Sequence, residues 1–235
     1  MASEDLTIDG LDGDAFEVWP AFVDLLAATS LLFVTLVAVY IFVANRQIGD
    51  SVTQRQKLVE ALGRATGAAS LYTIQDDGQF VRVTVQADAT FPLREWRIQS
   101  LREQGKLALD SIGGILQRES IKSLYREVRI LGHTDQIPFS DSSTSNWELS
   151  AARAAVVARY LVAKGLDACR ISATGRGPFY PLALQDSSLR KLPIAERMTR
   201  NRRIEIEIVP ARAAGVFEGP PCSRDGDKWR NRTQG

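Results

Sequence analysis

Histidine and cysteine are scarce in this sequence, which contains one histidine, His133, and two cysteines, Cys169 and Cys222. The cysteines form no CxxC pair and no cluster with the histidine, so the usual patterns of a zinc site are missing. The sequence also offers no Ser/His/Asp set, no Cys/His set and no phosphate-binding loop. We therefore expect no bound metal, no cofactor and no enzymatic activity.

An excess of charge of one sign is also lacking, because 29 Lys and Arg residues balance 28 Asp and Glu residues to a net charge of +1. Nucleic-acid-binding proteins usually carry a strong basic excess, so we expect no nucleic-acid partner. Residues 1–18 contain acidic residues but no Lys or Arg. Such a start is not typical of a signal peptide, and we interpret it as a tail.

A long apolar run is present at Ala21–Ala44, and it is 24 residues long. A helix rises about 1.5 Å per residue, so this run can cross a hydrocarbon core of roughly 30 Å with some tilt. Trp19 and Pro20 precede it, and an indole favours the membrane interface. We predict a retained transmembrane helix at residues 19–45.

Asp24 is the one charged residue of the apolar run. A carboxylate at membrane depth costs about 2.5–3.5 kcal/mol even on the most lenient scale, so it usually has a function. Asp24 therefore indicates an ion or proton site that faces a partner helix. The first basic residue, Arg46, follows the run, and the positive-inside rule alone would place the C-terminal side in the cytoplasm.

Residues 46–68 are polar with a thin apolar stripe. Ile48, Val52, Val59 and Leu62 recur at spacings of 4, 7 and 3, as in a short coiled coil. Two interpretations stay open: a solvated helical linker and the neck of a parallel dimer.

A globular domain is predicted at residues 69–210, followed by a tail at residues 211–235. Ser145 and Glu148 form a capping-box pattern at the start of a helix, and Gly165 follows its end. The alternation in Arg203–Val209 predicts a half-buried strand. The order of elements indicates an α+β sandwich with helices packed on one sheet. We expect helices at 98–116 and 146–164, two strands within 72–85 around Asp77-Gly78, and strands at 124–131, 170–174 and 203–209.

Polar side chains cluster at the ends of these elements. Asp135 follows a strand and can pair with an ammonium group, and Arg153 can hold a carboxylate by two parallel hydrogen bonds. Together they suit a zwitterionic ligand. From residue chemistry alone we favour the plainer alternative, in which these groups form structural salt bridges and caps.

Four motifs add a family resemblance: GHTD at 132–135, SNWELSAARA at 145–154, GRG at 175–177 and RNRRIEIEI at 200–208. In this order they resemble the OmpA-like peptidoglycan-binding domain over roughly residues 70–210. The SNWELS stretch after a longer loop is most similar to MotB-like stator proteins. The resemblance implies binding to the free ends of diaminopimelate in peptidoglycan. It assigns the ammonium to Asp135 and the carboxylate to Arg153, with Thr134, Asn146, Asn201 and Arg202 completing the pocket.

Peptidoglycan lies outside the bacterial inner membrane. The resemblance therefore implies a single-pass inner-membrane protein with a cytoplasmic N-terminus and a periplasmic C-terminal domain, against the charge rule. An oxidising periplasm permits a disulfide between Cys169 and Cys222, although two free thiols stay open as an alternative.

A single membrane helix with an Asp soon after Trp-Pro, joined to such a domain, resembles the B subunits of proton-driven stators. The compact build is most similar to ZorB, the B subunit of the Zorya anti-phage defence system. This implies a multi-pass A subunit (ZorA- or MotA-like), with two B chains inside a ring of five A chains, and H⁺ or Na⁺ as the transported ion. The alternatives are a MotB-type flagellar stator subunit and a passive cell-wall tether without ion transport.

Overall fold

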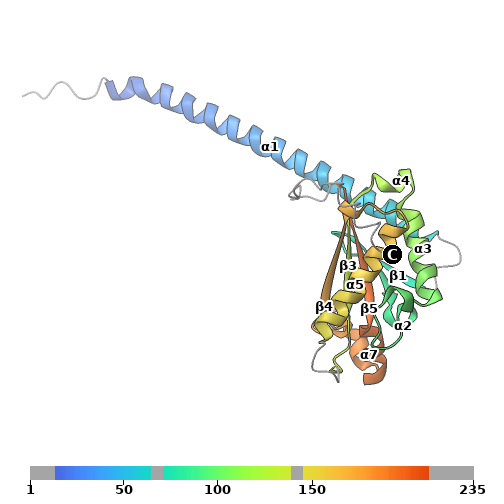
Figure 1. Cartoon of the computed structure of the whole chain (residues 1–235). Helices are drawn as coiled ribbons and strands as arrows, with labels where there is room; N and C mark the ends of the chain where they lie inside the picture. Colours follow the sequence, from blue (N-terminus) through green and yellow to red (C-terminus); the bar gives the residue numbers. More distant parts are fainter. Residues whose placement is uncertain (1–13, 65–70, 139–144, 212–235) are drawn as a thin grey trace, which may run out of the picture. The chain divides into compact units, whose positions relative to one another are not determined.

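The computed structural model describes residues 14–64, 71–138 and 145–211 (Figure 1). The chain divides into two compact units, residues 1–47 and 48–235. Most of each predicted tail lies outside the described part: residues 1–13 of the N-terminal tail and residues 212–235 of the C-terminal tail.

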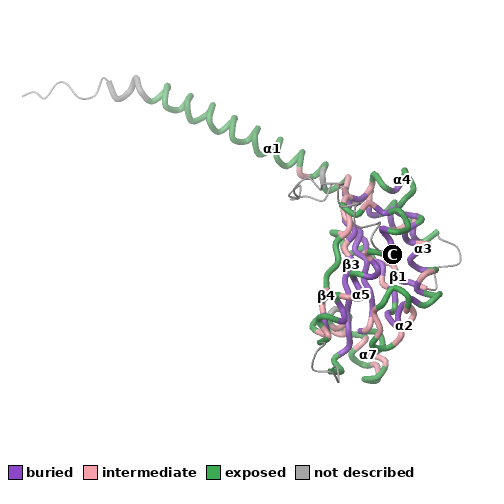
Figure 2. The backbone as a smooth tube through the Cα atoms, in the orientation of Figure 1, coloured by how far each residue is buried: buried purple, intermediate pink, exposed green. Residues whose placement is uncertain are grey.

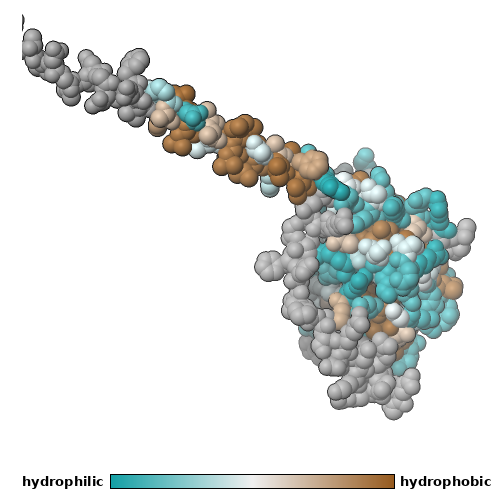
Figure 3. All heavy atoms as spheres, turned by 90° about the horizontal axis from the view of Figure 1, so that it is seen from above, coloured by the Kyte–Doolittle hydropathy of each residue, from teal (hydrophilic) through white to brown (hydrophobic). Residues whose placement is uncertain are grey.

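The first unit contains the N-terminal part of helix α1 (Asp14–Gly63). Among the described residues, Trp19–Gly63 is the one helical segment long and apolar enough to cross a membrane, and its most apolar window is fully exposed. Apolar side chains cover this part of the helix (Figure 3). The helix begins at Asp14, so Pro20 lies in its interior, beyond the first turn. Because proline has no backbone N–H, one hydrogen bond of the helix is missing there.

The last turns of α1 belong to the globular domain. Leu58 and Leu62 are fully buried in the domain core. Arg55 Nε donates to Asp76 Oδ1 at 2.8 Å, and the Tyr72 hydroxyl donates to the carbonyl of Leu62 at 3.1 Å. The segment predicted as a linker is therefore, in its second half, a packed helix of the domain, because Leu58 and Leu62 share one apolar face.

In the described part of the chain, five strands form one sheet in the order β1-β2-β5-β3-β4. β5 runs antiparallel to both β2 and β3, whereas β3 and β4 are parallel. Antiparallel β1 and β2 form the predicted hairpin around Asp77-Gly78, with Gly78 at a φ of 79°. The strands are β1 (Tyr72–Asp76), β2 (Val81–Gln86), β3 (Tyr125–His133), β4 (Ile171–Gly177) and β5 (Arg203–Pro210).

Helix α5 (Asn146–Ala163) packs along β3 and β4, and α3 (Glu103–Leu116) lies beside α5 (Figure 1). The capping box of Ser145 and Glu148 is present at the start of α5. Both helices and the sheet contribute buried residues to the core, and their backbone is coloured purple in Figure 2. The α+β prediction is confirmed. The remaining elements are α2 (Ala87–Thr90), η1 (Ile98–Ser100), α4 (Glu119–Lys122), η2 (Ala168–Arg170), α6 (Leu182–Gln185), η3 (Ser187–Lys191) and α7 (Ile194–Asn201).

Strand β5 differs from its prediction, because all of its residues are buried and not only every second one. Its polar positions form an ion-pair network. Arg203 Nε donates to Glu205 Oε1 at 2.7 Å, and Arg203 also donates to the carbonyls of Asn201 and Tyr180. Arg82 on β2 lies 3.4 Å from the other carboxylate oxygen of Glu205. Because these charged side chains are paired, the polar face of β5 can be buried, although its charged residues led us to expect it to be exposed.

Candidate functional site

Three of the sequence motifs meet at one edge of the sheet. The strand register pairs His133, the last residue of β3, with Gly177 at the end of β4 and with Arg203 at the start of β5. Asp135 follows β3, and Arg202 directly precedes β5. The start of α5 and helices α2 and α7 lie at the same end of the domain (Figure 1).

Glycines let α5 approach this edge closely. A Cβ on Gly132 would lie 2.0 Å from the carbonyl oxygen of Ser150, and one on Gly175 would lie 2.7 Å from the backbone nitrogen of Ala151. The fully buried Ser150 Oγ accepts a hydrogen bond from the Gly177 N–H at 3.0 Å. The glycines of the GHTD and GRG motifs therefore fix the first turns of α5 over the strand ends.

Asp135 lies at the centre of this edge, with 6% of its surface exposed. Its Oδ1 accepts from the backbone N–H of Ile137 at 3.1 Å. Asn146, the first residue of α5, donates to the carbonyls of Asp135 and Ile137 at 3.3 and 3.0 Å, which holds the loop after β3. Thr134 is buried next to it, and its Oγ1 has no hydrogen-bond partner among the described residues.

Arg202 bridges two carboxylates. Its Nη1 donates to Asp135 Oδ2 at 2.7 Å, while Nε and Nη2 donate to the two oxygens of Asp88 at 3.0 and 2.6 Å. Thr199 Oγ1 accepts a further bond from Nη2 at 3.2 Å. The hydrogen bonds to Asp88 and then those to Asp135 raise the pKa of Arg202, so its charge is fixed.

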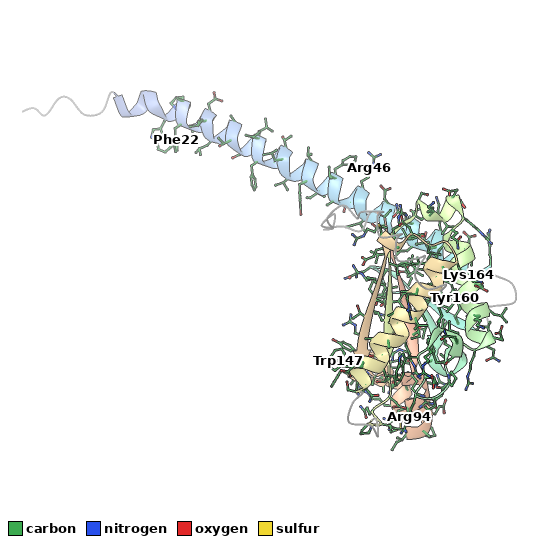
Figure 4. All side chains as sticks on the ribbon, in the orientation of Figure 1. Phe22, Arg46, Arg94, Trp147, Tyr160 and Lys164 are labelled. Atoms are coloured by element: carbon green, nitrogen blue, oxygen red, sulfur yellow. The ribbon has the colours of Figure 1, made fainter. Side chains whose placement is uncertain are left out.

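Arg153 is 2% exposed and projects from α5 toward the loop that follows α2. Its Nε donates to the Glu95 carbonyl at 2.9 Å and its Nη2 to the Pro92 carbonyl at 3.1 Å. Between these two carbonyls the loop turns at Arg94, which has a φ of 61° and is labelled at this end of the domain in Figure 4. The Phe91 ring lies 5.5 Å from the guanidinium carbon.

The guanidinium of Arg153 lacks an ion-pair partner within the described part of the chain. None of the carboxylates in the described residues lies within 4 Å of it, and its Nη1 donates to none of these residues. Burial lowers the pKa of Arg153 to about 10, opposed in part by the negative charge of Asp88. The side chain stays protonated at neutral pH, and its hydrogen bonds to the described residues come from Nε and Nη2 alone.

The structure brings together most of the predicted pocket residues. Thr134 and Asp135 directly follow β3, and Arg202 and Asn146 each donate a hydrogen bond to Asp135. The charges of Asp135 and Arg202 are near enough to act on the Arg153 guanidinium. Asn201 is different, because its Oδ1 accepts the N–H of Leu182 at 3.0 Å and so holds the start of α6. Sequence reasoning missed Asp88. It belongs to none of the four motifs, and a short Ala-Asp-Ala-Thr helix after a strand gives no local signal.

Three further predicted residues are Asp24, Cys169 and Cys222. Asp24 is exposed on α1, and the structure gives its carboxylate no ion-pair partner among the described residues. Cys169 is disulfide-bonded, but its predicted partner, Cys222, lies outside the described residues, so that pairing stays a prediction. Across the described ranges, no group of three or more His, Cys, Asp or Glu side chains could hold a metal ion.

Comparison with known proteins finds an OmpA-like stretch within the chain. Residues 98–191 match the OmpA family, a range that includes Thr134, Asp135, Asn146 and Arg153. Outer membrane protein A of Bordetella avium is 33% identical over 131 residues, which cover 56% of this chain and 59% of that protein. Outer membrane protein A of Shimwellia blattae is 31% identical over 53% of this chain and 49% of its own length. The chain thus spans about half the length of these curated relatives.

Solved structures show the same fold. A MotB-like protein from Desulfovibrio vulgaris has a TM-score of 0.57 and 22% identity, over 71% of this chain and 98% of that one. The cell wall anchor of the T6SS from Pseudomonas aeruginosa has a TM-score of 0.52 and 30% identity, over 66% of this chain and 99% of that one.

Proposed function

The chain carries an OmpA-like domain, and on that premise we propose that this domain binds peptidoglycan and ties the apolar helix α1 to the cell wall. The ligand is the free end of a diaminopimelate residue, which presents an ammonium and a carboxylate on one carbon. The 30% identity to a cell wall anchor over nearly its whole length supports a role in wall attachment.

The observation that carries this proposal is the buried guanidinium of Arg153, which has no ion-pair partner among the described residues. Burying a charge without a partner is costly, and structural sites normally neutralise it. Here two backbone carbonyls occupy the Nε/Nη2 edge, which fixes the orientation of the group. The Nη1/Nη2 edge then faces an incoming carboxylate in the two-pronged geometry that arginine favours.

Asp135 supplies the opposite charge for the ligand ammonium. One of its oxygens accepts from Ile137 and the other from Arg202, and each carboxylate oxygen has a second lone pair. Thr134 Oγ1, which is buried and unpartnered among the described residues, can accept or donate a further bond to the ligand. A zwitterionic group therefore matches the two charges and the spare hydrogen-bonding capacity of the site.

At a finer level, we propose that the chain is the B subunit of an inner-membrane, proton-driven stator of the Zorya anti-phage type. The supporting observation is Asp24, an acidic residue within the apolar segment of α1. A ring of A subunits would give this carboxylate the partner that α1 alone does not, with two copies of this chain inside five A subunits. A MotB-type flagellar subunit, a Na⁺-driven motor and a passive wall tether remain the competing functions.

The proposed topology places residues 1–18 in the cytoplasm and the OmpA-like domain in the periplasm, where peptidoglycan is accessible. It also places Cys169 and Cys222 in a compartment that sustains disulfides.

Co-sedimentation of the full-length chain in detergent with isolated peptidoglycan tests the proposal. We expect Arg153→Ala to abolish sedimentation, because it removes the group whose free edge receives the ligand carboxylate. Truncating one partner of a buried charge pair costs on the order of 2–5 kcal/mol, a loss of at least tenfold in affinity. Arg159→Ala, on the same helix but outside the pocket, is the matched control and retains binding. Sedimentation of a folded Arg153→Ala chain at the wild-type level would refute the proposal.

A further inference from the structure

Asp88 is a carboxylate of the site that none of the sequence motifs includes. It lies on α2, and the bond from Arg202 joins residues 114 positions apart in the chain. Its two oxygens accept from Nε and Nη2 of Arg202, which leaves Nη1 of Arg202 for Asp135. Asp88 thus decides which edge of Arg202 faces the ligand pocket.

The charges of this triad determine what Asp135 can accept. Two carboxylates and one guanidinium give Asp88, Arg202 and Asp135 a formal charge of −1 together. Without Asp88, the charges of Arg202 and Asp135 would sum to zero, so a ligand ammonium at Asp135 would lie near the Arg202 cation with no net negative charge to offset it. Like charges this close repel strongly in a partly buried site.

The influence of Asp88 also extends to the second half of the pocket. Among the charged neighbours of Arg153, Asp88 has the largest effect, ahead of Arg202, Asp135 and Glu95, and it favours the charged form of the guanidinium. The Glu95 carboxylate is engaged by the Ser100 hydroxyl at 3.3 Å. Asp88 therefore stabilises the cation that meets the ligand carboxylate and preserves the negative charge that meets the ammonium.

We propose that Asp88 is a specificity-determining positioning residue, which makes the pocket select ligands with a free ammonium beside the carboxylate over ligands whose amino group is acylated. The inference rests on the proposed peptidoglycan-binding function and names the residue that sets its preference for a free ammonium. In the cell wall, this criterion separates free diaminopimelate ends from ends whose amino group has been cross-linked as an amide.

Calorimetric titration of the full-length chain in detergent with two peptides measures this selectivity. Both are L-alanyl-γ-D-glutamyl-meso-diaminopimelate with an acetylated alanine amino group, and the second is also acetylated on the free diaminopimelate amine. We expect the wild type to prefer the free amine by about tenfold or more. Asp88→Asn lowers this preference to near one without weakening the acylated peptide, whereas Asp88→Glu keeps the preference. Glu103→Gln, an exposed carboxylate on α3, is the control and behaves as the wild type.

The double variant Asp88→Asn with Arg202→Gln distinguishes charge from shape. It removes one negative and one positive charge, so the triad keeps its net charge and the wild-type preference returns. A structural role for Asp88 predicts instead that both peptides weaken together in each variant. If Asp88→Asn does not fold, the double variant decides, and loss of its preference would overturn the inference. A wild type that binds neither peptide overturns the proposed function, and with it the role of Asp88.

Discussion

Two fully buried arginines of the domain show how a structural site differs from a binding site. Arg203 donates from Nε to Glu205 and from its two terminal nitrogens to the carbonyls of Asn201 and Tyr180. Arg153 is buried to a similar extent, but its hydrogen-bond partners among the described residues are backbone carbonyls on one edge. Since a protein gains nothing from an unpaired buried cation, this second arrangement supports the proposal that a ligand completes it.

The Glu205 ion pair predicts how stability depends on pH. Burial alone would raise the pKa of Glu205, but His133 and Arg203 beside it lower it from 4.5 to about 2. A carboxyl group with a lowered pKa stabilises the fold fully above its unfolded value and loses that contribution as the pH falls toward 2. The shift corresponds to on the order of 3 kcal/mol.

Thermal unfolding measured between pH 5 and pH 2 checks this value. We expect the melting temperature of the wild type to fall across this window and the Glu205→Gln variant, which starts lower because it leaves Arg203 unpaired, to show a much flatter dependence. Glu119→Gln, on an exposed carboxylate, keeps the wild-type slope. An equal slope in the Glu205 variant would show that other carboxyl groups account for the acid sensitivity.

At the residue scale, the sequence predicted a residue of this cluster only where that residue belongs to a recognisable motif. Asp135, Arg153 and Arg202 belong to motifs, and the structure places them in one cluster. Asp88 was missed because its partner is 114 positions away, a distance that local reasoning does not span. Asn201 was also expected in the pocket, and its Oδ1 accepts the N–H of Leu182, a tertiary contact that the local sequence does not encode.

At the scale of elements, the position of α5 over the strand ends sets the geometry of the site. This packing depends on glycine, because a Cβ on Gly132 would fall 2.0 Å from the Ser150 carbonyl oxygen, a backbone atom that cannot move aside. We therefore expect Gly132→Ala to lower the melting temperature strongly and to weaken peptidoglycan binding, since it displaces α5 and Arg153 with it.

Gly114→Ala is the matched control for this prediction. Gly114 lies in α3, and a Cβ added there would have no described atom within 4 Å beyond its own helix backbone, so alanine fits. Alanine is favoured over glycine inside a helix by about 1 kcal/mol, so this variant melts slightly higher than the wild type. If Gly132→Ala were equally harmless in a melting experiment, close packing of α5 would not explain the glycine.

The elements themselves were largely predictable, and the exceptions have physical causes. The hairpin at β1 and β2 and the capping box of α5 follow from local chemistry, and both are confirmed. The last turns of α1 were interpreted as a linker because their surface is polar, although Leu58 and Leu62 bury against the domain. β5 was expected to be half-buried, since the alternation in its sequence does not reveal that its glutamates pair with Arg82 on the neighbouring strand β2.

At the scale of the whole molecule, the chain combines a helix long and apolar enough to cross a membrane with an OmpA-like domain, for which we propose binding to the cell wall. The proposed motor function depends on Asp24, because a proton that crosses the membrane supplies about 2.3 kcal/mol per 100 mV. We expect Asp24→Asn to insert, assemble and bind peptidoglycan as the wild type does, but to lose all phage protection or motility. Asp24→Glu keeps the ionisable group and retains part of the activity.

Assays in cells that depend on this chain decide between a motor and a tether. A passive tether has no need for a titrating group, so it predicts full activity for Asp24→Asn. Equal membrane levels and equal wall binding of the two variants serve as the control. Full activity with asparagine would exclude ion transport through this residue and leave the wall-binding function untouched.

The central claim, that the site holds a zwitterionic end of peptidoglycan between Asp135 and Arg153, is tested most directly by a crystal structure of the chain with bound L-alanyl-γ-D-glutamyl-meso-diaminopimelate. We predict that the terminal carboxylate accepts hydrogen bonds from Nη1 and Nη2 of Arg153 while Glu95 and Pro92 keep their bonds to its other edge. The ammonium donates to Asp135, and Arg202 stays paired with Asp88. A peptide bound elsewhere on the domain, or a carboxylate held by Arg202 with Arg153 still unpaired, would contradict the account.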